Sequence, residues 1–79
     1  MKASDQFRAG DALLGGAAVV IAVKGDYVLC VLTTGNDSPF VTWWVDGRGQ
    51  VLSGAYHKEL GDAVRDLTAR AYRASGEAV

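Results

Sequence analysis

The stretch that decides the fold is Phe40-Val41-Thr42-Trp43-Trp44-Val45-Asp46-Gly47-Arg48-Gly49. Aromatic and β-branched residues stand before two glycines that tolerate the backbone angles of a tight turn, so this pattern predicts a strand over 40–45 and a hairpin connection after it. Side chains alternate across a strand. One face holds Val41, Trp43 and Val45, and the other holds Phe40, Thr42 and Trp44. Both faces are therefore apolar and aromatic.

Outward from this strand, turn signals divide residues 17–56 into an antiparallel meander. The predicted strands are 17–23, 27–34, 40–45 and 50–56. The first connection is Lys24-Gly25-Asp26, and five turn formers, Gly35-Asn36-Asp37-Ser38-Pro39, precede the third strand. The first two strands also carry apolar side chains on both faces, whereas a sheet with one hydrated face alternates between apolar and polar residues.

After His57-Lys58 the apolar period becomes helical and predicts one helix over 59–75, ended by Gly76. The apolar stripe is Leu60, Ala63, Val64, Leu67, Ala71 and Ala74, and the side expected to face solvent carries Asp62, Arg65, Asp66, Arg70 and Arg73. Asp66 precedes Arg70 by four residues, the favourable order for an ion pair along a helix.

Residues 1–16 allow two structures. Ser4 could cap a short helix that turns Phe7, Leu13 and Leu14 inward, or residues 7–14 could form a fifth strand ended by Gly15-Gly16. The Gly10-Asp11 pair resembles the entry to the first strand of small SH3-like barrels. The sequence thus predicts one α+β domain over 1–79: a four- to five-stranded antiparallel meander with a C-terminal amphipathic helix on one face.

Charge and cysteine content limit the compartment and the partners. The 79 residues carry eight Lys and Arg against nine Asp and Glu, a net charge of −1, whereas duplex binders usually have a basic excess. The only cysteine, Cys30, has no second thiol to pair with, which indicates a reducing, cytoplasmic setting. The longest apolar run, 17–23, is too short to span a bilayer, and the N-terminus lacks the apolar core of a signal peptide.

Few residues offer chemistry. His57 is the only histidine, so no zinc site with normal ligand spacing can form, and we expect His57 to be an ordinary polar residue between strand and helix. Cys30 lies in an apolar strand and is expected to be an inert core thiol. Gly47-Arg48-Gly49 lacks the ending of a phosphate loop, and Asp62 and Asp66 are expected to be solvated. We therefore predict no catalytic residue, cofactor, metal site or small-molecule substrate.

The apolar sheet is the main indication of function. The helix is expected to cover the face of Val41, Trp43 and Val45, which would leave Trp44 and Phe40 for another cover: the N-terminal residues, closure of the sheet into a barrel, a second copy, or a different protein. The expected interaction surface is Phe40, Thr42, Trp44, Arg48 and Tyr56.

Two functions follow from that surface. The first is a non-enzymatic module that binds a protein partner or forms a homodimer. The alternative is single-stranded nucleic-acid binding, in which Phe40, Trp44 and Tyr56 stack bases and the nearby cations contact phosphates. Those cations are Arg48, Lys58 and Arg65. The acidic balance makes a nucleic-acid partner the less favoured of the two.

Residues 39–49, followed by Gly54-Ala55-Tyr56 and by Leu60-Gly61-Asp62-Ala63-Val64, resemble small uncharacterised proteins of phages, plasmids and other mobile elements of GC-rich bacteria. The resemblance covers the C-terminal half and consists of an aromatic β-hairpin joined to a short amphipathic helix. It implies a small accessory protein that acts by contact. Proteins of this kind include anti-CRISPR inhibitors, which block a host complex by occupying a surface.

Overall fold

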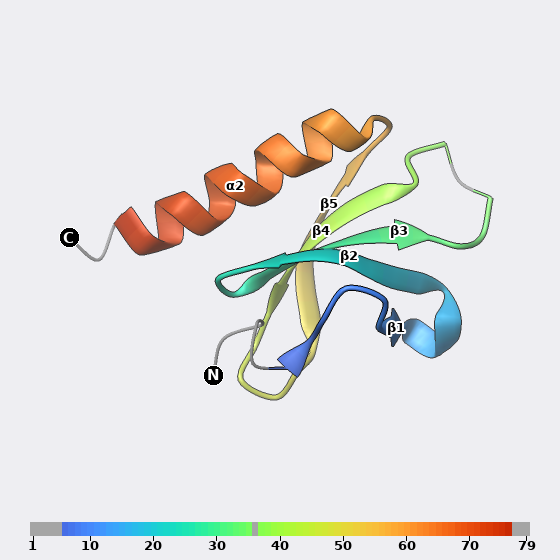
Figure 1. Ribbon diagram of the computed structural model, residues 1–79, viewed down its shortest axis with the longest axis horizontal. Helices are drawn as coiled ribbons and strands as arrows, with labels where there is room; N and C mark the ends of the chain where they lie inside the picture. The colour runs from blue at the N-terminus through green and yellow to red at the C-terminus, as the bar shows by residue number, and fades with distance from the viewer. Residues whose placement is uncertain (1–5, 36, 77–79) are drawn as a thin grey trace.

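The structure, a computed structural model, describes residues 6–35 and 37–76 (Figure 1). It is an α+β fold with a five-stranded antiparallel sheet in the order β1-β2-β3-β4-β5 and a C-terminal helix, α2. The elements are β1 (Ala12–Leu13), the 3₁₀ turn η1 (Leu14–Gly16), β2 (Ala18–Lys24), β3 (Tyr27–Leu32), β4 (Phe40–Val45), β5 (Val51–His57) and α2 (Leu60–Gly76). The predicted fold class is confirmed, and so are the four predicted strands and the helix; β4 has the predicted bounds, and the ends of the others shift by at most two residues.

The fifth strand exists but is shorter than the predicted range 7–14. β1 pairs with β2 through Ala12 and Leu13, and two backbone hydrogen bonds between Val20 and residues Gly10 and Asp11 extend the contact. Leu14 then leaves the extended conformation with a φ of 54°, which begins η1. The alternative with a helix capped by Ser4 lies outside the described residues.

A bulge in β2 changes the predicted faces of that strand. The pairing with β3 shifts between Val20 and Ala22, so Ile21 is the extra residue. Val20 and Val23 both lie on the side of Val28 and Cys30, although strict alternation would place them on opposite faces. Ile21 is left exposed.

The helix covers the face opposite to the one expected. Leu29 of β3 packs against Ala63 and Leu67 of α2, and Thr42 of β4 hydrogen-bonds to Asp66 of α2. α2 therefore lies on the side of Phe40, Thr42 and Trp44, and the expectation that it covers Trp43 was wrong. Two features favour this side. The buried stripe of α2 contains the small residues Ala63 and Ala71, which let the helix approach the sheet closely. Asp66 beside that stripe accepts a hydrogen bond from the hydroxyl of Thr42 on this side.

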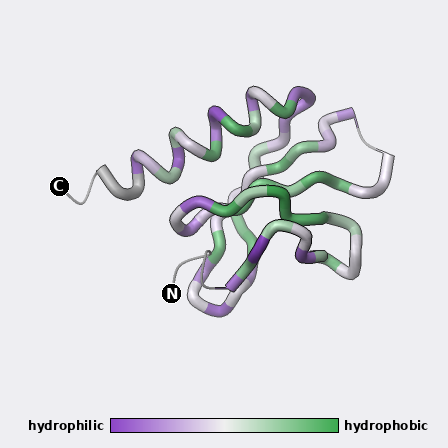
Figure 2. Tube along the Cα trace, viewed as in Figure 1, coloured by the Kyte–Doolittle hydropathy of each residue, from purple (hydrophilic) through white to green (hydrophobic). Residues whose placement is uncertain are grey.

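The other face of the sheet carries the larger core cluster, although Tyr56 on this face is 56% exposed. Its core consists of Ala18, Val20, Val28, Cys30, Val41, Trp43 and Val45, and it is flanked by partly buried Phe7, Leu13, Val23, Leu32 and Val51. Figure 1 shows the N-terminal segment on the side of the sheet away from α2, and Figure 2 shows the hydrophobic residues concentrated along β2, β3 and β4. Of the four possible covers, the N-terminal segment packs against this core, whereas the sheet does not close into a barrel, because its edge strands β1 and β5 do not pair with each other.

The predicted stripe of α2 is rotated in the structure. Ala63, Leu67 and Ala71 are buried, whereas Leu60 and Val64 are exposed. Asp66 and Arg70, expected to be solvated, instead face the sheet and are only partly exposed. A residue four positions along a helix lies on the same side, so Asp66 and Arg70 share the flank of the buried stripe that faces β5.

Candidate interaction surface

Two of the five predicted surface residues are covered by α2. Thr42 has no exposed surface, and partly buried Phe40 packs against the cluster of Leu29, Ala63 and Leu67. Phe40 and Thr42 lie on the same face of β4 as Trp44, as predicted, but α2 covers them. Thr42 is therefore not a surface residue, and Phe40 contributes mainly to the packing of the helix.

Trp44 remains on the surface and has a neighbour that the sequence did not single out. It lies opposite Leu52 of β5 and next to Tyr27 of β3. The side chain of Trp44 is 37% exposed and that of Leu52 is 44% exposed. Both are uncovered because α2 crosses the sheet diagonally, from the end of β5 to the β2–β3 turn, and so leaves the beginning of β5 open (Figure 1).

Leu52 also lines a cavity between the two edges of the sheet. This cavity, the β1–β5 gap, has a volume of about 350 Å³ and is bounded by Leu13, Leu14, Gly49, Gln50, Val51 and Leu52. β1 and β5 are the outermost strands of the sheet, so the curl of the sheet brings its two edges to the same space. Leu14 stands at this gap with 60% of its surface exposed. Leu14, Trp44 and Leu52 together are called the exposed apolar surface below.

Arg48 lies at one end of the gap, in the β4–β5 turn. One carboxylate oxygen of Asp46 accepts hydrogen bonds from the N–H groups of Arg48 and Gln50, at 2.8 and 2.9 Å. These bonds hold the turn closed, with Gly49 at a φ of 84°. The side chain of Arg48 is exposed, and the next residue, Gly49, lines the cavity.

A second bulge shapes the outer edge of β5. Ser53 has a φ of 55°, and the pairing of β4 with β5 shifts between Thr42 and Trp44. The carbonyl of Ser53 accepts a hydrogen bond of 3.0 Å from Arg70 of α2. The middle of this edge is therefore bound to the helix, whereas its first residues, Val51 and Leu52, border the gap.

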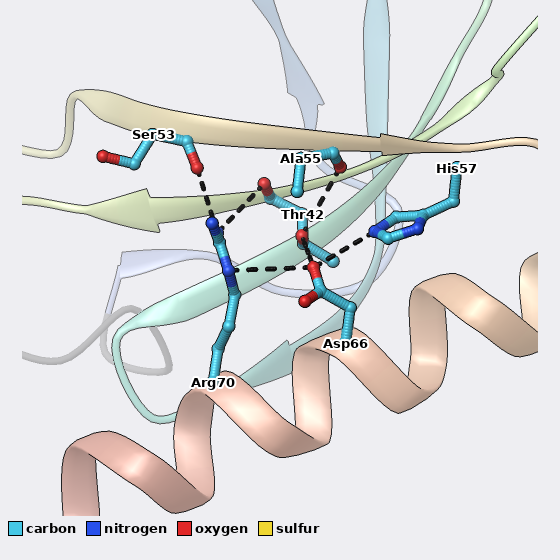
Figure 3. Close-up of polar contacts among 6 residues, drawn as sticks. All are labelled: Thr42, Ser53, Ala55, His57, Asp66 and Arg70. Atoms are coloured by element: carbon cyan, nitrogen blue, oxygen red, sulfur yellow. Dashed lines mark hydrogen bonds and ion pairs between the residues drawn. The ribbon is translucent and has the colours of Figure 1, made fainter.

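A polar cluster beneath α2 joins the helix to the sheet (Figure 3). One carboxylate oxygen of Asp66 accepts hydrogen bonds from the hydroxyl of Thr42 at 2.5 Å and from Nε2 of His57 at 3.1 Å. Arg70 lies 3.7 Å away from the same oxygen, which confirms the predicted ion pair. Partial burial opposes the charge of Asp66, but the hydrogen bonds from Thr42 and His57 and the positive charge of Arg70 outweigh it and lower the pKa of the carboxyl group below its ordinary value of 3.8.

The geometry of this cluster is that of a structural clasp. A nucleophilic hydroxyl would need a base that takes its proton and access to a substrate. Thr42 is fully buried, and both its hydroxyl and His57 donate to Asp66 instead of to each other. Arg70 also lies over the ring of Tyr27, with 5.5 Å between its central carbon and the ring centroid. Asp66 and Arg70 of α2 thus hold the helix to Tyr27 of β3, Thr42 of β4 and His57 of β5.

The remaining chemical groups are isolated. Cys30 is buried in the core, and desolvation raises the pKa of its thiol to about 12, so it is held as a neutral thiol. Within residues 6–35 and 37–76, no three His, Cys, Asp or Glu side chains come together in a way that could hold a metal ion. The same part of the chain contains no helix with the length and hydropathy required for a bilayer crossing.

The aromatic residues predicted to stack bases do not share one platform. Trp44 lies on the α2 side of the sheet, whereas Tyr56 lies opposite Val41 and therefore on the other side. Phe40 is partly buried next to α2. Stacking of successive bases needs aromatic rings along one open surface. The arrangement therefore does not favour nucleic-acid binding by this route.

Comparisons with protein-family models, with curated proteins and with solved structures gave no match to this chain. The site is therefore defined by its own geometry. Trp44 and Arg48 were predicted from the sequence and lie at or beside the exposed apolar surface, whereas Leu14 and Leu52 were not. The helix alternative for the N-terminus turned Leu14 inward, whereas Leu14 begins the turn η1 and is exposed.

Proposed function

We propose that the protein is a non-enzymatic interaction module that binds a protein partner through the exposed apolar surface. The proposal is supported above all by one observation: Leu14 and Leu52 stay exposed where they line the β1–β5 gap, and Trp44, which pairs with Leu52, is exposed beside it. Exposed apolar patches on small proteins mark contact sites, and interface contacts are rich in aromatic residues.

Other features agree with action by contact. Cys30 is buried, and His57 and Asp66 are bound to each other within the clasp. A cytoplasmic location and an accessory role in a phage or plasmid are part of the proposal. They rest on the single thiol and on the resemblance of the C-terminal half.

The proposal can be tested by affinity capture from a native lysate with matched variants. The test variant is Leu52→Lys, which places a charge in the exposed apolar surface. The control is Leu60→Lys on α2, because Leu60 is 46% exposed and so matches Leu52 in residue type and exposure. Thermal melting verifies that both variants fold.

We expect the wild type and Leu60→Lys to retain the same partner and Leu52→Lys to lose it. Sedimentation of the purified wild type shows whether that partner is a second copy. Recovery of the same proteins by all three forms, with no change in sedimentation, would contradict the proposal.

A further inference from the structure

We infer that a ridge of exposed side chains on α2 is a self-association surface, on which the same helix of a second copy packs in antiparallel orientation. The ridge, called the α2 ridge below, consists of Val64, Thr68 and Tyr72. It is separate from the exposed apolar surface, so this inference goes beyond the proposed function. It follows from the exposure of the ridge, from its spacing, and from the distribution of charge along the helix.

The α2 ridge carries large side chains that the described chain leaves open. Val64 is 44% exposed, and Tyr72 is 77% exposed, the highest value among the large hydrophobic side chains of the described residues. Tyr72 directly follows Ala71, which lies against Gly25 in the β2–β3 turn, so the ridge ends where the helix leaves the sheet. Figure 1 shows α2 as an outer layer with no other helix or strand on its far side. A second molecule can therefore approach the ridge along its whole length.

The α2 ridge lies on the side of the helix away from the clasp. Residues four apart share one side of a helix, so Val64, Thr68 and Tyr72 form one uncharged ridge. Thr68 is two residues away from both Asp66 and Arg70, which places it on the opposite side of the helix. A surface helix usually carries charged and polar residues where it faces solvent. An exposed valine and an exposed tyrosine on one uncharged ridge therefore indicate a contact surface.

The spacing of the α2 ridge is self-complementary. Val64 and Tyr72 each lie four residues from Thr68, which is about 6 Å along the helix axis. A twofold axis at Thr68 that relates two antiparallel helices therefore places Val64 of one copy against Tyr72 of the other, and does so twice. Thr68 is a small residue, and at the axis it lets the two helices approach closely.

The charge along α2 selects the antiparallel orientation. The acidic residue of the first turn is Asp62, and the basic residue of the last turn is Arg73. Asp62 lies six residues before Thr68, and Arg73 lies five residues after it. The same register therefore brings Asp62 of one copy beside Arg73 of the other, with an offset of about 1.5 Å along the axis. A parallel pair would instead place like charges beside each other.

A second copy is the occupant because this chain supplies both halves of the pattern. Among residues 6–35 and 37–76, no carboxylate lies within ion-pair distance of Arg73. Asp62 pairs with its helical neighbour Arg65, but its side chain is 52% exposed and can accept a further cation. Two such ion pairs and two contacts between Val64 and Tyr72 form in one symmetric interface.

The helix pair is short for a permanent dimer. α2 has 17 residues and is therefore about 25 Å long. One pair of helices of this length buries less surface than the roughly 1,600 Å² of a stable interface. We therefore expect a dimer that dissociates on dilution.

Sedimentation equilibrium of the full chain tests the inference at concentrations from about 10 µM to about 1 mM, the range in which weak interfaces associate. We expect monomers at the low end and dimers at the high end. Tyr72→Ala should raise the dissociation constant at least about tenfold, because two aromatic contacts are lost in each dimer. A monomer at every concentration would overturn the inference.

The matched control is Tyr56→Ala. Tyr56 is also an exposed tyrosine, but it lies on the face of the sheet away from α2. This variant should associate like the wild type, and thermal melting verifies that both variants fold. An equal loss of association in the two variants would overturn the inference.

Charge reversal tests the antiparallel register. Asp62→Lys alone and Arg73→Glu alone should each weaken the self-association, because each places like charges beside each other across the twofold axis. The double variant should recover most of the association, since the two charges are then exchanged. Weakening in both single variants without recovery in the double variant would exclude this register.

The two proposals fail in different ways. Leu52→Lys should self-associate like the wild type, and Tyr72→Ala should retain the partner captured from the lysate. Self-association that Leu52→Lys abolishes would place the dimer contact at the exposed apolar surface and overturn the inference. A purified protein that stays monomeric, together with a lysate partner that Tyr72→Ala loses, would mean that a different protein binds the α2 ridge, and the inference would again be wrong.

Discussion

Gly54 lies where the indole of Trp43 crosses β5. A Cβ at Gly54 would stand 2.6 Å from Nε1 and 2.9 Å from Cδ1 of that indole, closer than real contacts allow. Trp43 is 93% buried and belongs to the main core cluster, so the ring has little room to move. The absence of a side chain at Gly54 is thus a packing requirement that a sequence pattern of alternating strands does not reveal.

The variant Gly54→Ala should accordingly reduce the free energy of unfolding by about 1–3 kcal/mol, the usual effect of overpacking a core. Urea denaturation measures this change. The control is Gly47→Ala, because a Cβ there meets nothing within 4 Å, and its effect should stay within about 0.5 kcal/mol. Equal stability of the two variants would show that the Trp43 ring moves aside.

Asp66 is the residue that connects α2 to the sheet through charge. Replacement by Asn keeps the shape but removes the charge that Thr42, His57 and Arg70 surround, so Asp66→Asn should lose about 1.5–3 kcal/mol at neutral pH. The matched control is Asp62→Asn, whose partner Arg65 is an exposed neighbour on the same helix. That pair should contribute less than about 1 kcal/mol.

The effect of Asp66 should also depend on pH in one direction. Because the folded protein lowers the pKa of this carboxyl below 3.8, the folded state binds the proton more weakly than the unfolded chain does. Its stabilisation is complete above the unfolded pKa and is lost as the pH falls through the folded value. The difference in stability between wild type and Asp66→Asn should therefore shrink below about pH 4. A constant difference down to pH 2 would contradict this assignment.

At the level of elements, the attachment of α2 depends on a narrow stripe. Leu67 is 4% exposed and packs against Leu29, whereas Leu60, two turns earlier, is 46% exposed. Leu67→Ala should reduce the stability by about 2–5 kcal/mol, and Leu60→Ala should change it by less than about 1 kcal/mol. Thermal or urea unfolding of the pair compares the same substitution at both positions. Similar losses would mean that the helix is rotated relative to this arrangement.

The strands and the helix can be predicted from the sequence, but which face of the sheet the helix covers cannot. Turn residues and apolar periods predict four strands and the helix to within two residues, because these signals act locally. The face covered by α2 depends on contacts between distant positions, such as Thr42 with Asp66, and on the bulge at Ile21. From the sequence alone, an aspartate on the polar side of an amphipathic helix is predicted to face solvent, because its partner on the sheet is not known.

For the whole molecule, the interaction surface was only partly predictable. The excess of apolar side chains on the sheet pointed to Trp44, which is indeed exposed, but it also pointed to Thr42, which is buried. The exposure of Leu14 and Leu52 arises where two strands at opposite ends of the meander meet. That meeting depends on the curl of the whole sheet, which no local pattern specifies.

The free thiol of Cys30 can show whether the sheet and α2 open as one unit. Cys30 lies in the central strand β3, on the face away from α2, so detachment of the helix alone does not expose it. Labelling by a thiol reagent at neutral pH should therefore require opening of the sheet and be slower than that of an unfolded thiol by orders of magnitude. If the sheet and α2 open together, Leu67→Ala should accelerate labelling of Cys30 by the factor that corresponds to its loss of free energy of unfolding. This should hold although Leu67 packs on the opposite face of the sheet from Cys30. If Gly54→Ala accelerates labelling of Cys30 but Leu67→Ala does not, α2 opens separately from the sheet.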